Sequence, residues 1–164
     1  MYVLNHGGRL VIEGDGIALA APPRWHSRTI LPADARRSWN AVACRSGGGA
    51  SLAVAAGPSS SRDVNIPFGS ERRSLWILPP APAATPRRLT PASGASDELP
   101  MWSRNGRWLL FVRTTAHGSY LGHGQLYALN PASGRIIGPI APIGRAGSYY
   151  GDYGWENVLD WHRP

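Results

Sequence analysis

The feature that most constrains the fold of this chain is a pattern that occurs twice. The segment from Ser96 to Arg113 reads SDELPMWSRNGRWLLFVR, and a weaker copy from Ala41 to Gly57 reads AVACRSGGGASLAVAAG. Each copy has an extended segment, a glycine-containing turn and a second apolar segment, as in a β-hairpin. The same offset of 58 residues relates three pairs of positions: Gly106 with Gly48, Leu110 with Leu52, and Val112 with Val54. The sequence therefore predicts two copies of one hairpin.

Each predicted hairpin is followed by a third and a fourth β-prone segment. The third segments run from Arg73 to Pro79 and from Gly124 to Asn130, and they align Trp76 with Tyr127 at an offset of 51 residues. The smaller offset fits a longer polar loop, SSSRDVNIPFGSE, in the first copy, because loops vary in length more than strands do. The fourth segments read RRLTP and RIIGPI. Four strands repeated at about 50 residues are typical of a propeller blade.

The predicted strands are apolar at consecutive positions, as in WLLFV, SLAVAA and LWIL. A strand with one solvated face alternates between apolar and polar residues, whereas a strand buried on both faces does not. Radial stacking of sheets is therefore favoured over a sandwich, in which each sheet keeps one polar face. We find no convincing helical periodicity with caps.

We expect an all-β fold of about three four-stranded antiparallel blades of an incomplete β-propeller. The first blade is indicated by a hairpin in which Arg9 to Glu13 and Ile17 to Ala21 flank Gly14-Asp15-Gly16, since glycine supplies the positive φ of tight turns. A single domain over residues 1–164 would hold blades at 1–35, 39–91 and 97–141, with a closing strand or tail at 147–164. Three blades are too few for an ordinary ring. We interpret the chain as part of a longer propeller, with self-assembly or an open stack as alternatives.

The stretch DELPMWSRNGRWLLFVR and the later GQLYALNPASGR resemble the blade repeat of TolB-like β-propellers, which are WD-repeat-like. That repeat has an acidic residue, Pro-x-Trp-Ser, Asp/Asn-Gly, an apolar strand, Leu-Tyr and a turn ending in Gly. The resemblance extends from about Arg73 to Ile140 and implies the C-terminal portion of such a propeller. It is fainter from Trp39 to Gly57, where Cys44 replaces the Trp and Gly47-Gly48 replace Asn-Gly. The matching positions are Asp97 or Glu98, Pro100, Trp102, Ser103, Asn105, Gly106, Tyr127 and Gly134.

The matching positions have structural roles rather than chemical ones. Pro100 is expected at the beginning of an inner strand, where no ladder donor is needed. Trp102 is expected to fill the gap between neighbouring blades. Asn105-Gly106 predicts a type I′ turn, whose twist matches that of the strands it joins. Hydrogen bonds to turn backbone are expected from three side chains: Asp97 or Glu98, and Ser103.

The net charge of +7 comes from 17 arginines and 10 acidic residues, with no lysine. Arginine binds phosphate groups well, but the arginine pairs at 36–37, 72–73 and 87–88 are spread along the chain without a dense run. The joint abundance of Ala, Gly, Pro and Arg is typical of a bacterial, GC-rich coding sequence. The charge pattern therefore does not favour a nucleic-acid partner.

Catalytic and metal-binding patterns are weak in this sequence. No Gly-x-Ser-x-Gly elbow occurs, and Ser, His and Asp form no recognisable catalytic constellation. His117 and His123 share one loop, but no Cys, Asp or Glu lies within it to complete a metal site. Cys44 stands alone among small apolar neighbours, which favours a buried inert thiol. We expect no enzyme activity, no cofactor, no metal and no membrane span.

The expected function is a non-catalytic scaffold that binds a protein, a peptide or a small ligand through loops at one rim of the blades, as the resemblance implies. The aromatic tail after Gly147 could supply contact residues or instead pack as a last strand. Candidate partner-binding residues are Arg104, Arg107, His117, His123, Tyr149, Tyr150, Tyr153 and Trp155.

Alternative interpretations remain at this point. The chain could be the propeller portion of a larger prolyl-oligopeptidase-like or glycan-processing enzyme, or a lectin-like module that uses the aromatic tail. Its partner could also be the missing blades of a longer chain or a second copy. A fragment of an exported protein would be periplasmic or extracellular, and otherwise the chain would be cytoplasmic.

Overall fold

The computed structural model describes residues 2–6, 9–13, 16–20, 23–44, 51–58, 72–79, 81, 85–114 and 124–143. The described residues form three antiparallel four-stranded sheets. The first sheet contains β1 (Tyr2–His6), β2 (Arg9–Glu13), β3 (Ile17–Ala20) and β4 (Ser27–Leu31). The second contains β5 (Arg37–Cys44), β6 (Leu52–Pro58), β7 (Ser74–Leu78) and β8 (Arg87–Arg88). The third contains β9 (Ser96–Trp102), β10 (Leu109–Thr114), β11 (Gly124–Leu129) and β12 (Ile136–Ile143).

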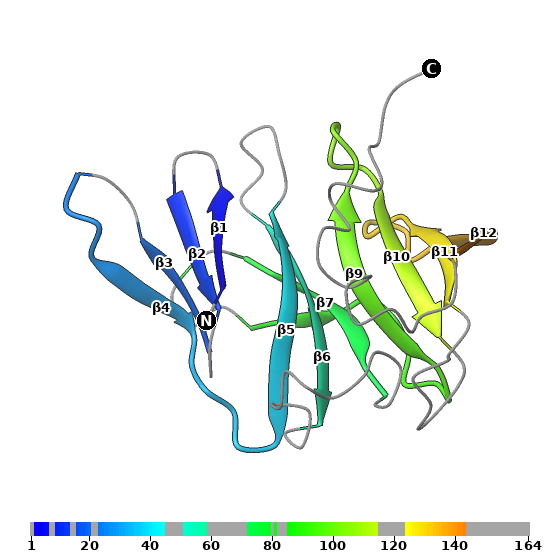
Figure 1. The fold of residues 1–164 in the computed structure, drawn as a ribbon, viewed down its shortest axis with the longest axis horizontal. Coiled ribbons are helices and arrows are strands. Elements are labelled where there is room, and N and C mark those ends of the chain that lie inside the picture. The colour runs from blue at the N-terminus through cyan, green and yellow to red at the C-terminus, as the bar shows by residue number, and fades with distance from the viewer. Residues whose placement is uncertain are drawn as a thin grey trace.

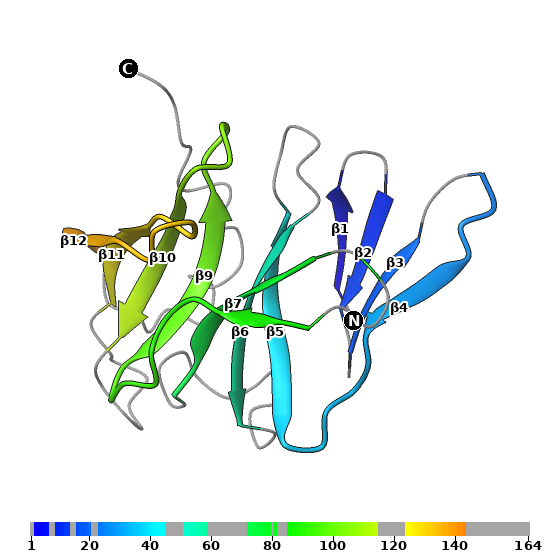
Figure 2. The same ribbon diagram turned by 180° about the vertical axis from the view of Figure 1, so that it is seen from behind.

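Within each sheet the strands lie side by side in chain order. The second sheet lies between the other two, so that the sheets stack like successive blades (Figures 1 and 2). The first strand of each sheet makes the central contacts, because β5 packs against β1 and β2, and β9 packs against β5, β6 and β7. This arrangement confirms the all-β class and the four-stranded antiparallel blades. The hairpin expected between β2 and β3 is present, with Glu13 paired to Ile17.

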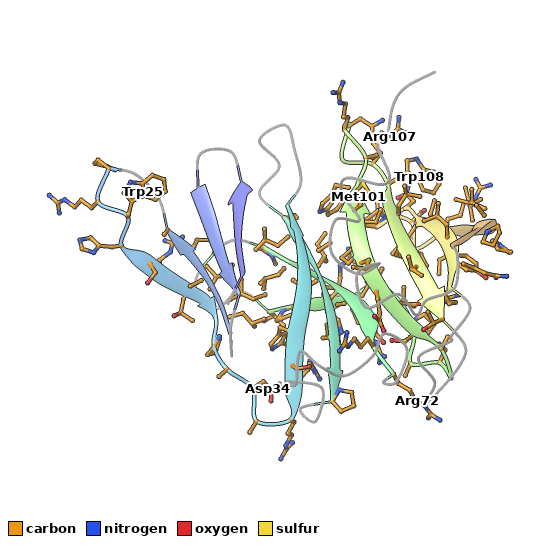
Figure 3. All side chains as sticks on the ribbon, in the orientation of Figure 1. Trp25, Asp34, Arg72, Met101, Arg107 and Trp108 are labelled. Carbon is orange, nitrogen blue, oxygen red and sulfur yellow. The ribbon has the colours of Figure 1, made fainter. Side chains whose placement is uncertain are left out.

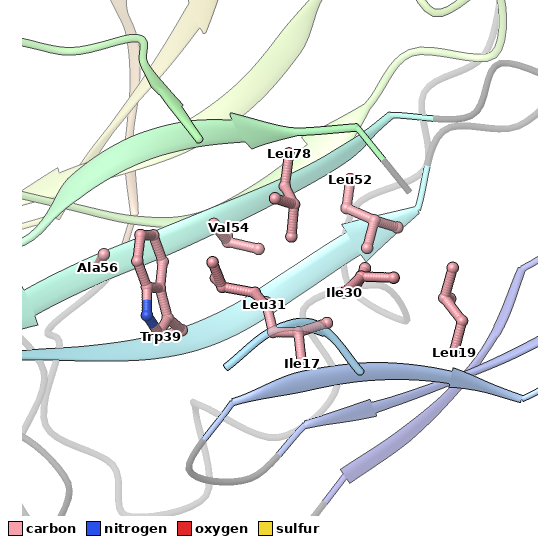
Figure 4. Close-up of a cluster of buried hydrophobic side chains, with 9 residues drawn as sticks. All are labelled: Ile17, Leu19, Ile30, Leu31, Trp39, Leu52, Val54, Ala56 and Leu78. Carbon is pink, nitrogen blue, oxygen red and sulfur yellow. The ribbon is translucent and has the colours of Figure 1, made fainter. Parts of the chain in front are cut away.

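The seam between the first and second sheets is apolar (Figure 4). β3 and β4 contribute the aliphatic side, and the second sheet contributes an indole together with small and aliphatic side chains. Burial of such surface stabilises a fold by about 25 cal/mol per Å². The buried members of this cluster are Ile17, Leu19, Ile30, Leu31, Trp39, Leu52, Val54, Ala56 and Leu78.

The seam between the second and third sheets uses the opposite face of β6. Ala53 and Ala55 of that strand lie in a second cluster, although Leu52 and Val54 belong to the first. All of β6 from Leu52 to Gly57 is buried, so the consecutive apolar pattern does reflect burial on both faces. The buried members of the second cluster are Ala53, Ala55, Leu75, Trp102, Leu109, Phe111 and Leu129.

The two hairpins correspond with a one-residue shift that the constant offset of 58 misses. Ala43 pairs with Ala53, and Met101 pairs with Leu110. Met101 lies 58 residues after Ala43, but Leu110 lies only 57 after Ala53. The predicted alignment of Leu110 with Leu52 is therefore wrong, because one residue of slip would move the strand's side chains to the other face. The corrected offset matches the pairing of Val54 with Trp76 and of Phe111 with Tyr127.

Pro100 does not begin a strand, contrary to the expectation. It lies inside β9 at a break in register, where Met101 pairs with Leu110 and Glu98 pairs with Val112. Two residues of β9 thus face one residue of β10, as in a β-bulge, and Leu99 adopts φ 52° there. A bulge tolerates proline because its extra residue makes no ladder hydrogen bond.

Candidate binding surface

The turn between β9 and β10 is held by its own side chains. Ser103 Oγ donates to Asn105 Oδ1 at 2.9 Å, and the Trp108 amide donates to Ser103 Oγ at 3.0 Å. The Arg107 amide donates to Asn105 Oδ1 at 3.0 Å. Asn and Ser favour turns because their short side chains can take such backbone bonds. The turn backbone therefore has a defined shape.

This turn is not of the predicted type I′. The Gly106 amide donates to the Ser103 carbonyl at 2.8 Å, so the four-residue turn begins at Ser103. Gly106 has φ 63°, but Asn105 is not among the residues with positive φ, and a type I′ turn needs positive φ at both central positions. The central residues are Arg104 and Asn105, with glycine in the following left-handed position.

Arg104 and Arg107 are both exposed on this turn. Figure 3 shows Arg107 at one end of the molecule, with Asp34 and Arg72 at the other. We call the first the turn end, defined by Ser103 to Trp108, and the second the base end, where β9 begins at Ser96 and β10 ends at Thr114.

The sequence-predicted partner residues divide between these two ends. Thr114 and Gly124, which flank the loop with His117 and His123, pair with each other at the base end. Arg104 and Arg107 lie at the turn end, so the chain does not bring that loop and these arginines out of the sheet at one rim. The remaining candidates lie outside the described residues, as do the two histidines themselves: Tyr149, Tyr150, Tyr153 and Trp155.

Trp102 lies in the seam between the second and third sheets. Its side chain is 8% exposed and belongs to the cluster with Ala53, Ala55 and Leu75 of the preceding sheet. Tyr127 borders the same cluster and stacks on Phe111, with ring centroids 5.6 Å apart. These aromatic rings supply much of the contact area of the seam.

Gly134 serves a different part of the third sheet. It ends the turn between β11 and β12 with φ 72°, and its amide donates to the Asn130 carbonyl at 2.8 Å. The Asn130 amide in turn donates to the Arg135 carbonyl at 2.8 Å, which closes the turn.

Asp97 binds a side chain rather than turn backbone. Its buried carboxylate accepts from Arg113 Nε at 2.6 Å and Nη2 at 2.9 Å, a bidentate pair between β9 and β10. The hydrogen bond from Arg113 to Asp97 raises the pKa of Arg113, burial opposes this, and the charge of Asp97 adds to it. The guanidinium also lies over Phe111 and Tyr127, at 5.4 and 5.0 Å from the ring centroids.

Glu98 ties the second sheet to the third. It accepts a short hydrogen bond from Ser96 Oγ, and its Oε2 lies 3.6 Å from Arg73 Nη1. Backbone bonds join the same segments, since the Asp97 amide donates to the Arg73 carbonyl at 3.1 Å. The two buried acidic residues therefore have structural partners within the fold.

A third arrangement, which the sequence interpretation missed, lies on the second sheet. The Arg37 guanidinium is 4.5 Å from the centroid of the Trp76 ring, and the Arg88 guanidinium is 5.6 Å from it. Trp39 meets Trp76 edge to face, with centroids 5.8 Å apart. Arg37 and Trp39 share a face by strand alternation, which was readable from sequence. The pairing of Arg88 with Trp76 was not, because it depends on the fold of the connection before β8.

Positive charge dominates the exposed surface that the structure describes. No Asp or Glu is exposed among the side chains with a described burial: Asp34 is half-buried, and Asp97 and Glu98 are buried. No three His, Cys, Asp or Glu side chains gather into a metal-binding group in the described ranges. Nor does that part of the chain contain a helix long and apolar enough to span a membrane. The exposed arginines are Arg24, Arg28, Arg36, Arg72, Arg87, Arg88, Arg104, Arg107 and Arg135.

Comparison with known proteins gives one weak structural likeness. No protein-family model matches the chain, and no curated protein matches its sequence. Among solved structures, that of "putative TolB from Agrobacterium tumefaciens" is matched with a TM-score of 0.33 and 11% identity over 79% of this chain. The chain covers 57% of the length of that structure. The blade interpretation itself rests on the sheet topology and packing described above.

Proposed function

We propose that this chain is a non-catalytic, TolB-like propeller segment that binds a protein or small-ligand partner through loops at the blade rim. The observation that carries the proposal is the turn from Ser103 to Trp108. It presents two exposed arginines on a backbone held by three hydrogen bonds from or to Ser103 and Asn105. Binding residues are commonly found on such loops, positioned by a rigid scaffold.

The rest of the described chain supports a scaffold role. The buried carboxylates of Asp97 and Glu98 each join strands through arginine partners, which suits them to holding the blades rather than to reacting with a substrate. The surrounding seams are filled with apolar side chains. A turn on such a framework loses little conformational freedom on binding.

The test is quantitative capture of proteins from an extract of the source organism, using the wild type, Arg104→Ala/Arg107→Ala and a control, Arg24→Ala/Arg36→Ala. Both variants remove two exposed positive charges, but only the first changes the turn. We expect at least one captured protein to fall about tenfold with the turn variant, as for the loss of one good charged contact, and to change less than twofold with the control. Equal capture by all three proteins would refute binding through this turn.

A further inference from the structure

Arg37, Trp76 and Arg88, which we call the Trp76 patch, come from three neighbouring parts of the second sheet. Arg37 begins β5, Trp76 lies in β7, and Arg88 ends β8. Trp76 pairs directly with Arg88 and packs against the first apolar seam. Its ring is half-buried, Arg37 is half-buried and Arg88 is exposed. The three side chains therefore form a partly open surface whose base is fixed by the sheet.

Two positive charges meet at one indole ring in this patch. Both guanidinium groups lie within the roughly 6 Å at which a cation is attracted to an aromatic face. No carboxylate of the described residues forms an ion pair with either arginine, since the described ion pairs are Arg73 with Glu98 and Arg113 with Asp97. Arg88 donates one hydrogen bond to Ser74 Oγ. Each guanidinium has five donors, so most of them stay available.

The third sheet shows what such an arrangement binds when the carboxylate is internal. Tyr127 occupies the position there that Trp76 occupies in the second sheet, as the pairings with Phe111 and Val54 show. An arginine again lies over this ring, but Asp97 takes both Nε and Nη2 of Arg113. The second sheet has the aromatic ring and the cations without the acid.

We infer that the Trp76 patch is a recognition site for carboxylate groups of an acidic segment in a partner protein. The planar fork of arginine matches a carboxylate with two parallel hydrogen bonds. Stacking on the ring holds each fork in place, which reduces the entropy lost on binding. Two forks on one ring suit two acidic side chains close together in a peptide. A nucleic-acid backbone needs a longer run of cations, so an acidic peptide fits this patch better.

This site is separate from the turn end. Arg37 is at the start of β5, and Arg104 and Arg107 belong to the turn that follows β9. A matched pair of double variants can therefore distinguish the two surfaces. Failure of one proposal leaves the other unaffected.

The experiment is fluorescence anisotropy with a labelled peptide of four Glu-Gly repeats. A Gln-Gly peptide and a labelled oligothymidine of eight nucleotides serve as comparison probes. Wild type, Arg37→Gln/Arg88→Gln and Arg104→Gln/Arg107→Gln are titrated at low salt. We expect the Kd for the Glu peptide to rise about tenfold or more in the first variant, from the loss of charge-assisted bonds, and to change less than twofold in the second. The Gln peptide should not bind.

Further variants separate binding from folding. Arg37→Lys/Arg88→Lys keeps the charge but loses the fork, so we expect an intermediate Kd if bidentate contacts matter. Arg88→Gln alone changes the exposed member and should weaken binding if the double variant fails to fold. Three results would overturn the inference: no binding of the Glu peptide to the wild type, equal binding by both Gln double variants, or tighter patch-dependent binding of the oligothymidine, which would assign the patch to nucleic acid instead.

Discussion

At the scale of single residues, the base end of the third sheet depends on charge pairing inside the fold. Asp97 is 1% exposed and the Arg113 side chain 21%. The pKa of Arg113 is raised above its ordinary value of 12.5. A group whose pKa is raised by folding contributes stability below its unfolded pKa, and this contribution is lost only as pH rises through the folded value. Arg113 therefore stays charged at neutral pH, and its own titration should not weaken the pair there.

Asp97→Asn tests this pairing. The substitution keeps the shape of the side chain but removes its charge, which leaves the Arg113 guanidinium largely buried without a counter-charge. We expect the free energy of unfolding to fall by about 3 kcal/mol, the lower part of the range for breaking a buried ion pair. Urea denaturation followed by circular dichroism measures it. Asp34→Asn, at a half-buried carboxylate, is the comparison, and a similar loss in both variants would contradict a special role for Asp97.

At the scale of elements, the turns determine how strands of each blade meet. The hairpins of the second and third sheets share a bulge at corresponding positions, between Asn40 and Ala43 and between Glu98 and Met101. The first-strand offset is 58 residues, yet the offset of the second strand is 57. One residue of difference in the connecting turn thus preserves which face each side chain takes, because strand side chains alternate. Loop length and strand register are adjusted together.

Gly134→Ala tests the conformation of the turn between β11 and β12. A Cβ at Gly134 would meet no atom within 4 Å, so only its φ of +72° opposes alanine. We expect a loss of about 1 kcal/mol in the free energy of unfolding, the cost of a left-handed conformation for a residue with a Cβ. Gly134→Asn should recover part of it, because Asn tolerates this conformation.

Gly94→Ala is the matched control for Gly134→Ala. It has equally open surroundings, and its φ lies outside the left-handed range. We expect no loss of stability there, since alanine restricts the unfolded chain more than glycine does. Equal effects at the two glycines in thermal denaturation would show that backbone conformation is not the cause.

At the scale of the whole molecule, stability comes from sheets that share apolar seams. The second sheet uses both faces, and the clusters on its two sides are built from alternate residues of β6. Each seam combines aliphatic or small residues of the earlier sheet with an indole from the first strand of the next, Trp39 in one seam and Trp102 in the other. Loss of either indole should therefore loosen two sheets together.

Trp102→Ala tests the second seam. We expect it to lower the free energy of unfolding by about 3 to 5 kcal/mol, as for other large-to-small changes at buried aromatic residues. Trp25→Ala, at an indole that is 50% exposed, should change stability by less than about 1 kcal/mol. Chemical denaturation measures both. A small effect at Trp102 would show that the two sheets do not depend on this contact.

The sequence by itself determined the architecture of this chain, because consecutive apolar positions are explained only by strands buried on both faces. The motif around Trp102 and the Ser103 turn also indicated where a blade seam and a rim lie. Local pattern carries this information, since alternation and turn preference act within a few residues.

Only the tertiary structure decided the register of the second strand, the position of Pro100 in a bulge, and the partner of Asp97. It also brought Arg37 and Arg88 to one face of Trp76 and separated the arginine turn from the strand ends that flank the histidine loop. These features join residues that are distant in sequence. Their positions depend on exact loop lengths and on how neighbouring sheets pack, and a repeat with a one-residue difference hides both.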